Sequence, residues 1–174
     1  MTTSNVTQAG APDSVPQVTD AWLVIPLYNE ATVVREVISQ ARETFPYIVV
    51  VDDGSKDDSA RQAAAAGAIV VRHPVNLGQG AALQTGFSYI LEKTNANYVV
   101  TFDADGQHST TDAAAMVAAA REEELAVILG SRFLQGPSPV GRLKRLVLRT
   151  AAAVSSRTSG MHLTDAHNGL RVLR

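Results

Sequence analysis

The chain has 174 residues, 45% of them hydrophobic and 18% charged, a composition that is typical of a globular protein and excludes a disordered or fibrous one. It contains no cysteine, which excludes disulfide frameworks, thiolate metal sites and cysteine nucleophiles. The net charge is only −2, but residues 1–131 have 7 Lys/Arg against 16 Asp/Glu, whereas residues 132–174 have 8 against 1. This asymmetry argues against a uniformly basic nucleic-acid surface. It fits either a metal site beside a phosphate or anionic membrane surface, or an ordinary acidic body with one basic helix.

The first 20 residues are rich in Thr, Ser, Gln and Pro and contain neither Lys nor Arg. They lack the apolar stretch of a secretory signal, so residues 1–20 are predicted to be a disordered leader. No run in the chain approaches the roughly 18 apolar residues that a membrane-spanning helix needs. The sequence therefore predicts a protein of cytosolic type.

From residue 21 onward, short β-branched runs alternate with helical patterns. The runs predict strands over residues 21–27, 47–51, 68–72, 98–102 and 126–129. The apolar spacing between them predicts helices over residues 32–44, 59–66, 80–91 and 111–121, with Gly67 as a C-cap, and a basic helix over residues 141–157. Strands that are apolar on both faces and alternate with helices are typical of a parallel sheet. The sequence predicts one α/β domain over residues 21–174.

Open α/β sheets bind ligands at the carboxyl ends of their strands, so the polar residues that follow each predicted strand are candidate site residues. After the first strand come Tyr28, Asn29 and Glu30, which can contact a ligand or cap the next helix. After the second come the adjacent Asp52 and Asp53, although a simple turn needs only one carboxylate. Their oxygens can accept hydrogen bonds from a nucleotide base or ribose.

The segment after the third strand contains Asn76, Gly78 and Gly80. It is not a Rossmann dinucleotide fingerprint, because Leu83 stands at the position of the third glycine and the segment does not follow the first strand. The glycines either leave a helix N-terminus open to an anion or form a purely structural turn.

The fourth strand is followed by Asp103, Asp105 and Gln107. An EF-hand is excluded, because Gln107 and His108 occupy its fifth and sixth positions, and Gln107 also excludes a haloacid-dehalogenase-like phosphatase. Two carboxylates two residues apart after a core strand can converge on Mg²⁺ or Mn²⁺ and leave other positions for water and phosphate. A surface turn is the alternative.

Six segments, in this order, resemble glycosyltransferase family 2, and within it the polyprenyl-phosphate (dolichyl- or undecaprenyl-phosphate) sugar transferases. They are VIPLYNE (24–30), VVVDDGSKD (49–57), NLGQGAALQTGF (76–87), FDADGQH (102–108), GSRF (130–133) and DAHNGLRVLR (165–174). The resemblance implies a GT-A fold, a three-layer α/β/α arrangement with a mostly parallel central sheet. It also implies inverting, metal-dependent transfer from a nucleotide-diphosphate sugar to a polyprenyl phosphate, with no nucleic-acid partner.

The resemblance also assigns roles to residues. Asp103, Asp105 and Gln107 are expected to hold Mg²⁺ or Mn²⁺, and Arg132 and Arg145 to lie near the acceptor phosphate. Asp103, Asp105 and Asp165 are the expected catalytic residues, Asp165 as the base if the acceptor is a hydroxyl. The expected donor-binding residues are Pro26, Tyr28, Asn29, Glu30, Val51, Asp52, Asp53, Asn76, Gly78, Gly80 and Ala104.

Two alternatives remain open from the sequence: transfer to a saccharide or protein hydroxyl, and a non-catalytic nucleotide-sugar-binding protein. Because the chain stops at Arg174, inside the last shared segment, a C-terminally shortened domain and a membrane-protein partner are expected. The basic tail suits anionic headgroups, so the expected location is cytoplasmic, peripheral at the inner face of the membrane.

Overall fold

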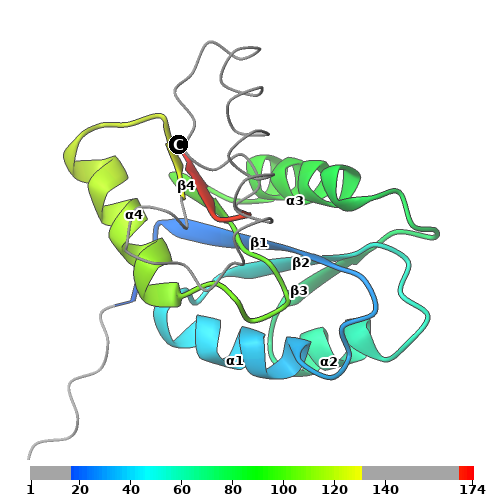
Figure 1. Ribbon diagram of the computed structural model, residues 1–174. Coiled ribbons are helices and arrows are strands. Elements are labelled where there is room, and N and C mark those ends of the chain that lie inside the picture. Colours follow the sequence, from blue (N-terminus) through cyan, green and yellow to red (C-terminus); the bar gives the residue numbers. More distant parts are fainter. Residues whose placement is uncertain (1–16, 131–168) are drawn as a thin grey trace, which may run out of the picture.

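The computed structural model describes residues 17–130 and 169–174, in which strands and helices alternate (Figure 1). The elements are β1 (Ala21–Leu27), α1 (Val34–Thr44), β2 (Ile48–Asp52), α2 (Ser59–Ala65), β3 (Ile69–Arg72), α3 (Gln79–Lys93), β4 (Tyr98–Thr101), α4 (Thr110–Glu122), β5 (Val127–Leu129) and β6 (Arg171–Leu173). Within the described ranges, no helix is long and apolar enough to cross a bilayer. The helix expected over residues 141–157 lies outside those ranges.

The strands form one six-stranded sheet in the order β3-β2-β1-β4-β6-β5. β1 is parallel to β2 and to β4, and β2 is parallel to β3. β6 is antiparallel to both of its neighbours, β4 and β5. The expected α/β fold with a mostly parallel sheet is therefore confirmed. The sequence did not predict β6, because three residues are too few to show a strand period.

The helices cover the two faces of the sheet unequally, with α1, α2 and α4 on one face and α3 on the other (Figure 1). Alternating residues of the strands supply the two cores, since side chains along a strand point to opposite faces. Leu23 and Ile25 of β1 pack in the first core. Val24 of β1 and Val49 of β2 pack in the second, with α3. The result is the predicted three-layer arrangement.

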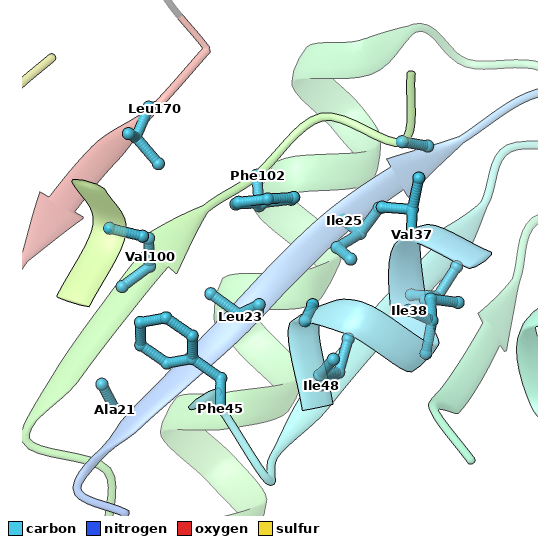
Figure 2. Close-up of a cluster of buried hydrophobic side chains, with 14 of the residues drawn as sticks. Ala21, Leu23, Ile25, Val37, Ile38, Phe45, Ile48, Val100, Phe102 and Leu170 are labelled. Atoms are coloured by element: carbon cyan, nitrogen blue, oxygen red, sulfur yellow. The ribbon is translucent and has the colours of Figure 1, made fainter. Parts of the chain in front are cut away.

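The larger core lies between the sheet and α1 (Figure 2). Ile38 of α1 and Phe45 at the end of that helix cover Leu23 and Ile25, and all four side chains are fully buried. Burial of each such side chain stabilises the fold by roughly 1.5–3 kcal/mol. This core fixes β1, β2 and β4, whose carboxyl ends supply the site described below.

The backbone bears on two local predictions, the glycine that ends α2 and the leader over residues 1–20. Gly67, two residues after the end of α2, has a φ of +90°, and its N–H donates to the carbonyl of Ala64 at 2.9 Å, so the predicted helix-ending glycine is confirmed. The leader predicted over residues 1–20, by contrast, overlaps the folded part of the chain at its last residues. Val18 is buried and its N–H donates to the carbonyl of Thr44 at 2.8 Å, while the Asp20 carbonyl accepts from the N–H groups of residues 97 and 98. Residues 17–20 therefore belong to the folded domain.

Candidate functional site

A cleft of about 380 Å³ opens at the carboxyl edge of the sheet, beside the N-terminus of α3. β1, β2 and β4 end there because they are parallel. The lining residues come from the end of β1, the start of α3 and the loops that follow β1, β2, β3 and β4. They are Pro26, Leu27, Tyr28, Glu30, Asp53, Asn76, Gly78, Gln79, Ala82, Asp103, Ala104 and Asp105. Residues that are up to 79 positions apart in the sequence thus surround one space.

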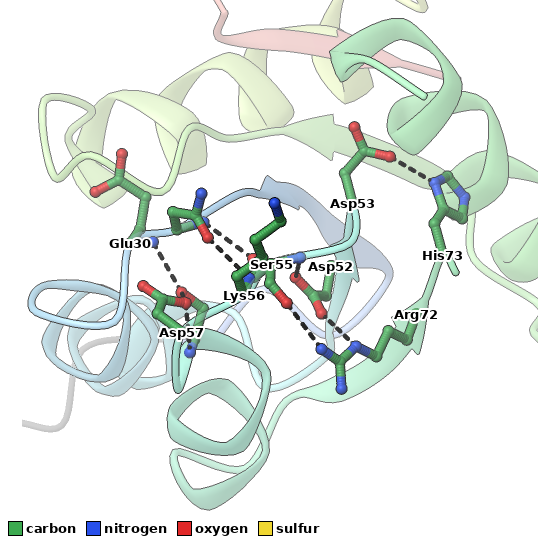
Figure 3. Close-up of polar contacts among 10 residues, drawn as sticks. Glu30, Asp52, Asp53, Ser55, Lys56, Asp57, Arg72 and His73 are labelled. Atoms are coloured by element: carbon green, nitrogen blue, oxygen red, sulfur yellow. Dashed lines mark hydrogen bonds and ion pairs between the residues drawn. The ribbon is translucent and has the colours of Figure 1, made fainter. Parts of the chain in front are cut away.

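The loop after β1 is fixed by hydrogen bonds to the loop after β2. Asn29 has a φ of +56°; its N–H donates to Ser55 Oγ at 2.9 Å, and its side-chain oxygen accepts from the Lys56 N–H at 3.0 Å. The Glu30 N–H donates to Ser59 Oγ at 2.8 Å. Asn29 therefore links the loop after β1 to the loop after β2 through its backbone and its side chain. The carboxylate of Glu30 points away from these contacts (Figure 3).

Asp57 strengthens the same junction. Its carboxylate accepts from the hydroxyl and N–H of Ser59 and from the N–H of Ala31. The Ser59 hydroxyl is the largest of the effects that hold the pKa of Asp57 below its ordinary value. Asp57 lies just before α2, so this junction also fixes the start of that helix.

The adjacent carboxylates after β2 point in different directions, Asp52 toward Arg72 and Asp53 toward His73 (Figure 3). Asp52 is fully buried; its Oδ1 accepts from the Ser55 N–H at 3.0 Å, and its Oδ2 lies 2.9 Å from Arg72 Nε. That second contact is an ion pair without hydrogen-bonding angles. Asp52 does not line the cleft, so of the two candidates only Asp53 does.

Asp53 accepts three hydrogen bonds inside the protein. Its Oδ1 accepts from the Leu77 N–H at 2.9 Å and from His73 Nδ1 at 2.7 Å, and its Oδ2 accepts from the Gly78 N–H at 2.8 Å. Burial alone would raise the pKa of Asp53, but these three donors together hold it below its ordinary value. Asp53 is therefore an ionised carboxylate at neutral pH.

The loop after β4 brings Asp103 and Asp105 to the same cleft. Both oxygens of Asp103 have hydrogen-bond partners. Gln79 Nε2 lies 3.2 Å from Oδ1, and His108 Nε2 lies 2.8 Å from Oδ2. The Gln107 N–H donates to Asp105 Oδ1 at 3.0 Å, and the Gln107 side chain is exposed and does not line the cleft. The two predicted metal-binding carboxylates are thus brought together, with Gln107 beside them.

Several residues that the sequence pointed to lie elsewhere. Val51 is fully buried beneath α3, and Gly80, in the first turn of α3, is exposed and outside the lining set. Arg132, Arg145 and Asp165 lie outside the described residues. Gln79 was missed; its place between two glycines of the predicted loop was the available signal.

The cleft fits a divalent cation on electrostatic grounds. Its described lining includes four carboxylates, those of Glu30, Asp53, Asp103 and Asp105, and neither lysine nor arginine. Carboxylate oxygens are the hard ligands that Mg²⁺ and Mn²⁺ prefer. In the described part of the chain, no group of three or more acidic, His or Cys side chains is placed to hold a metal ion. Two carboxylates on an open cleft suit a cation that takes its other ligands from water and phosphate.

The fold and this cleft define a class of protein: an α/β domain with a mostly parallel sheet and paired carboxylates at the carboxyl edge of that sheet. Residues 22–174 match the family model of glycosyl transferase family 2, so the chain belongs to that family. The resemblance inferred from the six sequence segments is thereby confirmed.

Curated relatives cover most of this chain. An uncharacterised protein of Methanocaldococcus jannaschii is 33% identical over 155 residues, 87% of this chain and 63% of that protein. A UDP-N-acetylglucosamine–dolichyl-phosphate N-acetylglucosaminyltransferase of Methanococcus voltae is 28% identical and shares 86% of this chain and 67% of its own length. An undecaprenyl-phosphate mannosyltransferase of Micrococcus luteus is 29% identical, over 87% of this chain and 65% of its own length. The chain thus spans about two thirds of these relatives.

Solved structures confirm the GT-A fold. Mannosyl-3-phosphoglycerate synthase from Rubrobacter xylanophilus matches with a TM-score of 0.67 at 21% identity, over 88% of this chain and 52% of the other. Glucosyl-3-phosphoglycerate synthase from Mycobacterium tuberculosis matches with a TM-score of 0.64 at 25% identity, over 88% of this chain and 55% of the other. That structure was solved with Mn²⁺, uridine diphosphate and phosphoglyceric acid.

Proposed function

We propose that this chain is the donor-binding part of a metal-dependent, inverting glycosyltransferase that moves a sugar from a nucleotide-diphosphate sugar to a polyprenyl phosphate. The observation that carries the proposal is the cleft. Asp53, Asp103 and Asp105, from two different loops, line the same space beside the N-terminus of α3. Family membership and the names of the curated relatives support it.

The donor lies along the cleft, with its nucleoside at one end and its diphosphate at the other. Pro26, Tyr28 and Asp53 contact the nucleoside; Tyr28 is 44% exposed and offers a ring face for a base. The diphosphate lies beside Gly78 and Gln79, where the N-terminus of α3 favours an anion.

Asp103 and Asp105 would hold Mg²⁺ or Mn²⁺, with Gln107 beside them as a further oxygen ligand. When bound, such a cation would supply Lewis-acid chemistry, offsetting the charge of the leaving diphosphate. Gln79 and His108 orient the Asp103 carboxylate through the hydrogen bonds to its two oxygens. A diphosphate is itself anionic, so the four carboxylates of the cleft lining make a cation necessary for donor binding.

In the transfer, an acceptor oxygen attacks the anomeric carbon from the face opposite the diphosphate. The carbon–oxygen bond to the diphosphate breaks, and its electron pair leaves with the nucleoside diphosphate. A polyprenyl phosphate is already anionic near neutral pH and needs no base. Arg132 and Arg145 bind its phosphate, since arginine contacts phosphate bidentately, while a hydroxyl acceptor would instead need Asp165 as its base.

We place the protein on the cytoplasmic side, peripheral at the inner face of the membrane, where polyprenyl phosphates are accessible. The last 43 residues have eight Lys/Arg and one acidic residue, a balance that suits anionic headgroups. A membrane-protein partner would contribute further contacts to the lipid acceptor.

The test is release of nucleoside diphosphate from a panel of nucleotide sugars in the presence of Mn²⁺ and undecaprenyl phosphate in detergent. Asp105→Ala should lower turnover by at least about 100-fold, because it removes one of the two carboxylates proposed to hold the cation. The matched control is Asp112→Ala, an exposed carboxylate in the first turn of α4, which should retain turnover.

Each outcome decides between the proposals. Turnover that is insensitive to Asp105→Ala would refute the metal assignment. Turnover with saccharide hydroxyls but not with the lipid phosphate would favour the hydroxyl-acceptor alternative. Donor binding by calorimetry without turnover on any acceptor would favour a non-catalytic nucleotide-sugar-binding protein.

A further inference from the structure

His73 lies at the end of β3, between the loop after β2 and helix α3, and no role has yet been assigned to it. It is 8% exposed, and both of its ring nitrogens have partners. Nδ1 lies 2.7 Å from Asp53 Oδ1 (Figure 3). Nε2 lies 2.9 Å from Thr85 Oγ1 of α3. A buried histidine with two specific partners has one defined orientation.

The chemistry of the partners fixes the direction of these hydrogen bonds. Asp53 is an ionised carboxylate, which can only accept, so His73 Nδ1 has the proton and donates it. In the neutral ring, Nε2 then accepts from the Thr85 hydroxyl, which can donate. Thr85 thus stabilises the tautomer in which Nδ1 faces Asp53.

A carboxylate has about four lone-pair positions, two on each oxygen. On Asp53 Oδ1 both are used, one by His73 Nδ1 and one by the Leu77 N–H. On Oδ2 one is used, by the Gly78 N–H. One acceptor position therefore remains on Asp53, on Oδ2, and Asp53 lines the cleft together with Pro26 and Tyr28.

We propose that His73 is a specificity-determining positioning residue: by occupying Asp53 Oδ1, it limits the site to a donor base that presents a single N–H, a uracil-type pyrimidine imide. This inference rests on the proposed function, in which Asp53 contacts the base. Guanine presents two adjacent N–H donors that match both oxygens of a free carboxylate. With Oδ1 already saturated, one of them would be buried without an acceptor, at a cost of about 1–3 kcal/mol, or about 10- to 100-fold in affinity.

The experiment compares the affinities for UDP and GDP, each with Mn²⁺, by calorimetry. The wild-type chain should bind UDP at least about tenfold more tightly than GDP. N3-methyl-UDP, which has no imide N–H, should lose at least about tenfold relative to UDP. Because these measurements use only the wild-type protein, they test the inference even if a variant fails to fold.

The variants then test His73 itself. His73→Asn keeps an N–H near the position of Nδ1 and should keep the UDP/GDP ratio within about threefold of the wild type. His73→Ala frees Oδ1 and should lower that ratio about tenfold. The matched control is Thr44→Val, at a buried threonine of α1 that does not line the cleft, which should leave the ratio unchanged. A role confined to stability would change the unfolding transition and not the ratio.

The outcomes separate this inference from the proposed function. Binding of GDP as tightly as UDP, or a folded His73→Ala variant with the wild-type ratio, would overturn the role of His73 and leave the donor site intact. Binding of neither nucleotide would overturn the donor site, and the inference with it.

Discussion

Gly169 allows the chain to return to the sheet directly against the carboxylate of Asp103. A Cβ on Gly169 would lie 2.0 Å from Asp103 Oδ2 and 2.6 Å from both Cγ and Oδ1. The hydroxyl of Thr101 donates to the Gly169 carbonyl, and β6 begins two residues later, so the backbone here is tied to β4. We therefore expect Gly169→Ala to displace the Asp103 side chain rather than the backbone.

The size of the effect follows from what Asp103 would lose. Rotation of its carboxylate would break the contacts with His108 Nε2 at 2.8 Å and Gln79 Nε2 at 3.2 Å. Loss of the groups that orient a metal ligand typically costs 10- to 100-fold in affinity or activity, and we expect a loss of about that size in Mn²⁺-dependent UDP binding. The added methyl should also destabilise the fold by about 1–3 kcal/mol.

Calorimetry of UDP binding across a Mn²⁺ series measures the first effect, and urea unfolding measures the second. The control is Gly67→Ala. Gly67 has a φ of +90° at the end of α2, so alanine there should cost about 1–2 kcal/mol of stability and leave UDP affinity unchanged. If Gly169→Ala binds UDP with Mn²⁺ within twofold of the wild type, or if Gly67→Ala loses affinity equally, the reasoning is refuted.

Three further predictions concern the framework of the site. A Cβ on Gly86 of α3 would lie 2.4 Å from Val24 Cγ1, so Gly86→Ala should destabilise the fold by about 1–2 kcal/mol. In a double-mutant cycle measured by urea unfolding, Val24→Ala should relieve part of that cost. Additive effects of the two substitutions would contradict this packing. The folded-state pKa of Asp53 is lowered, so its contribution to stability is present above the unfolded pKa of about 4 and is lost as pH falls through the folded value. Asp53→Asn should therefore be less stable at pH 7 and show a shallower loss below about pH 4; parallel stability curves would contradict this. Gly54 has a φ of +76°, and its Cβ would lie 2.8 Å from the carbonyl carbon of Val75, so Gly54→Ala should lower the thermal midpoint by at least about 4 °C, as calorimetry would detect.

Much of the fold could be predicted from the sequence, because apolar runs and helical spacing are local signals. β1 begins and ends at the predicted residues, and α3 differs by one residue at its start and two at its end. β6 could not be predicted, because its three residues become a strand only through pairing with β4 and β5. That the polar loops meet could also be predicted, since parallel strands present their carboxyl ends at one edge.

The particular side chains that face the cleft could not be predicted, because this depends on which face of the sheet α3 covers. Val51 is buried on the α3 face, and side chains alternate along a strand, so Asp53 continues on that face and Asp52 points to the opposite one. Val51 lies beneath α3, whereas Asp53 lies at the N-terminus of that helix, where it accepts from the Gly78 N–H. The sequence contains the alternation but not the position of the helix, which is why Asp52 and Asp53 remained equivalent candidates.

The carboxylates of the cleft differ in how far hydrogen bonds offset their charge, and this difference explains where a cation would bind. Asp53 accepts from three donors, whereas Asp103 accepts from two side chains and Asp105 from one backbone N–H. Each donor stabilises the ionised form and reduces the gain from adding a cation. Among these three aspartates, the charge is therefore least compensated at the end of β4, beside the N-terminus of α3. Removal of divalent cations with EDTA should abolish UDP binding there, because no Lys or Arg of the described lining can replace them. UDP affinity that is unchanged by EDTA would refute this distribution of charge.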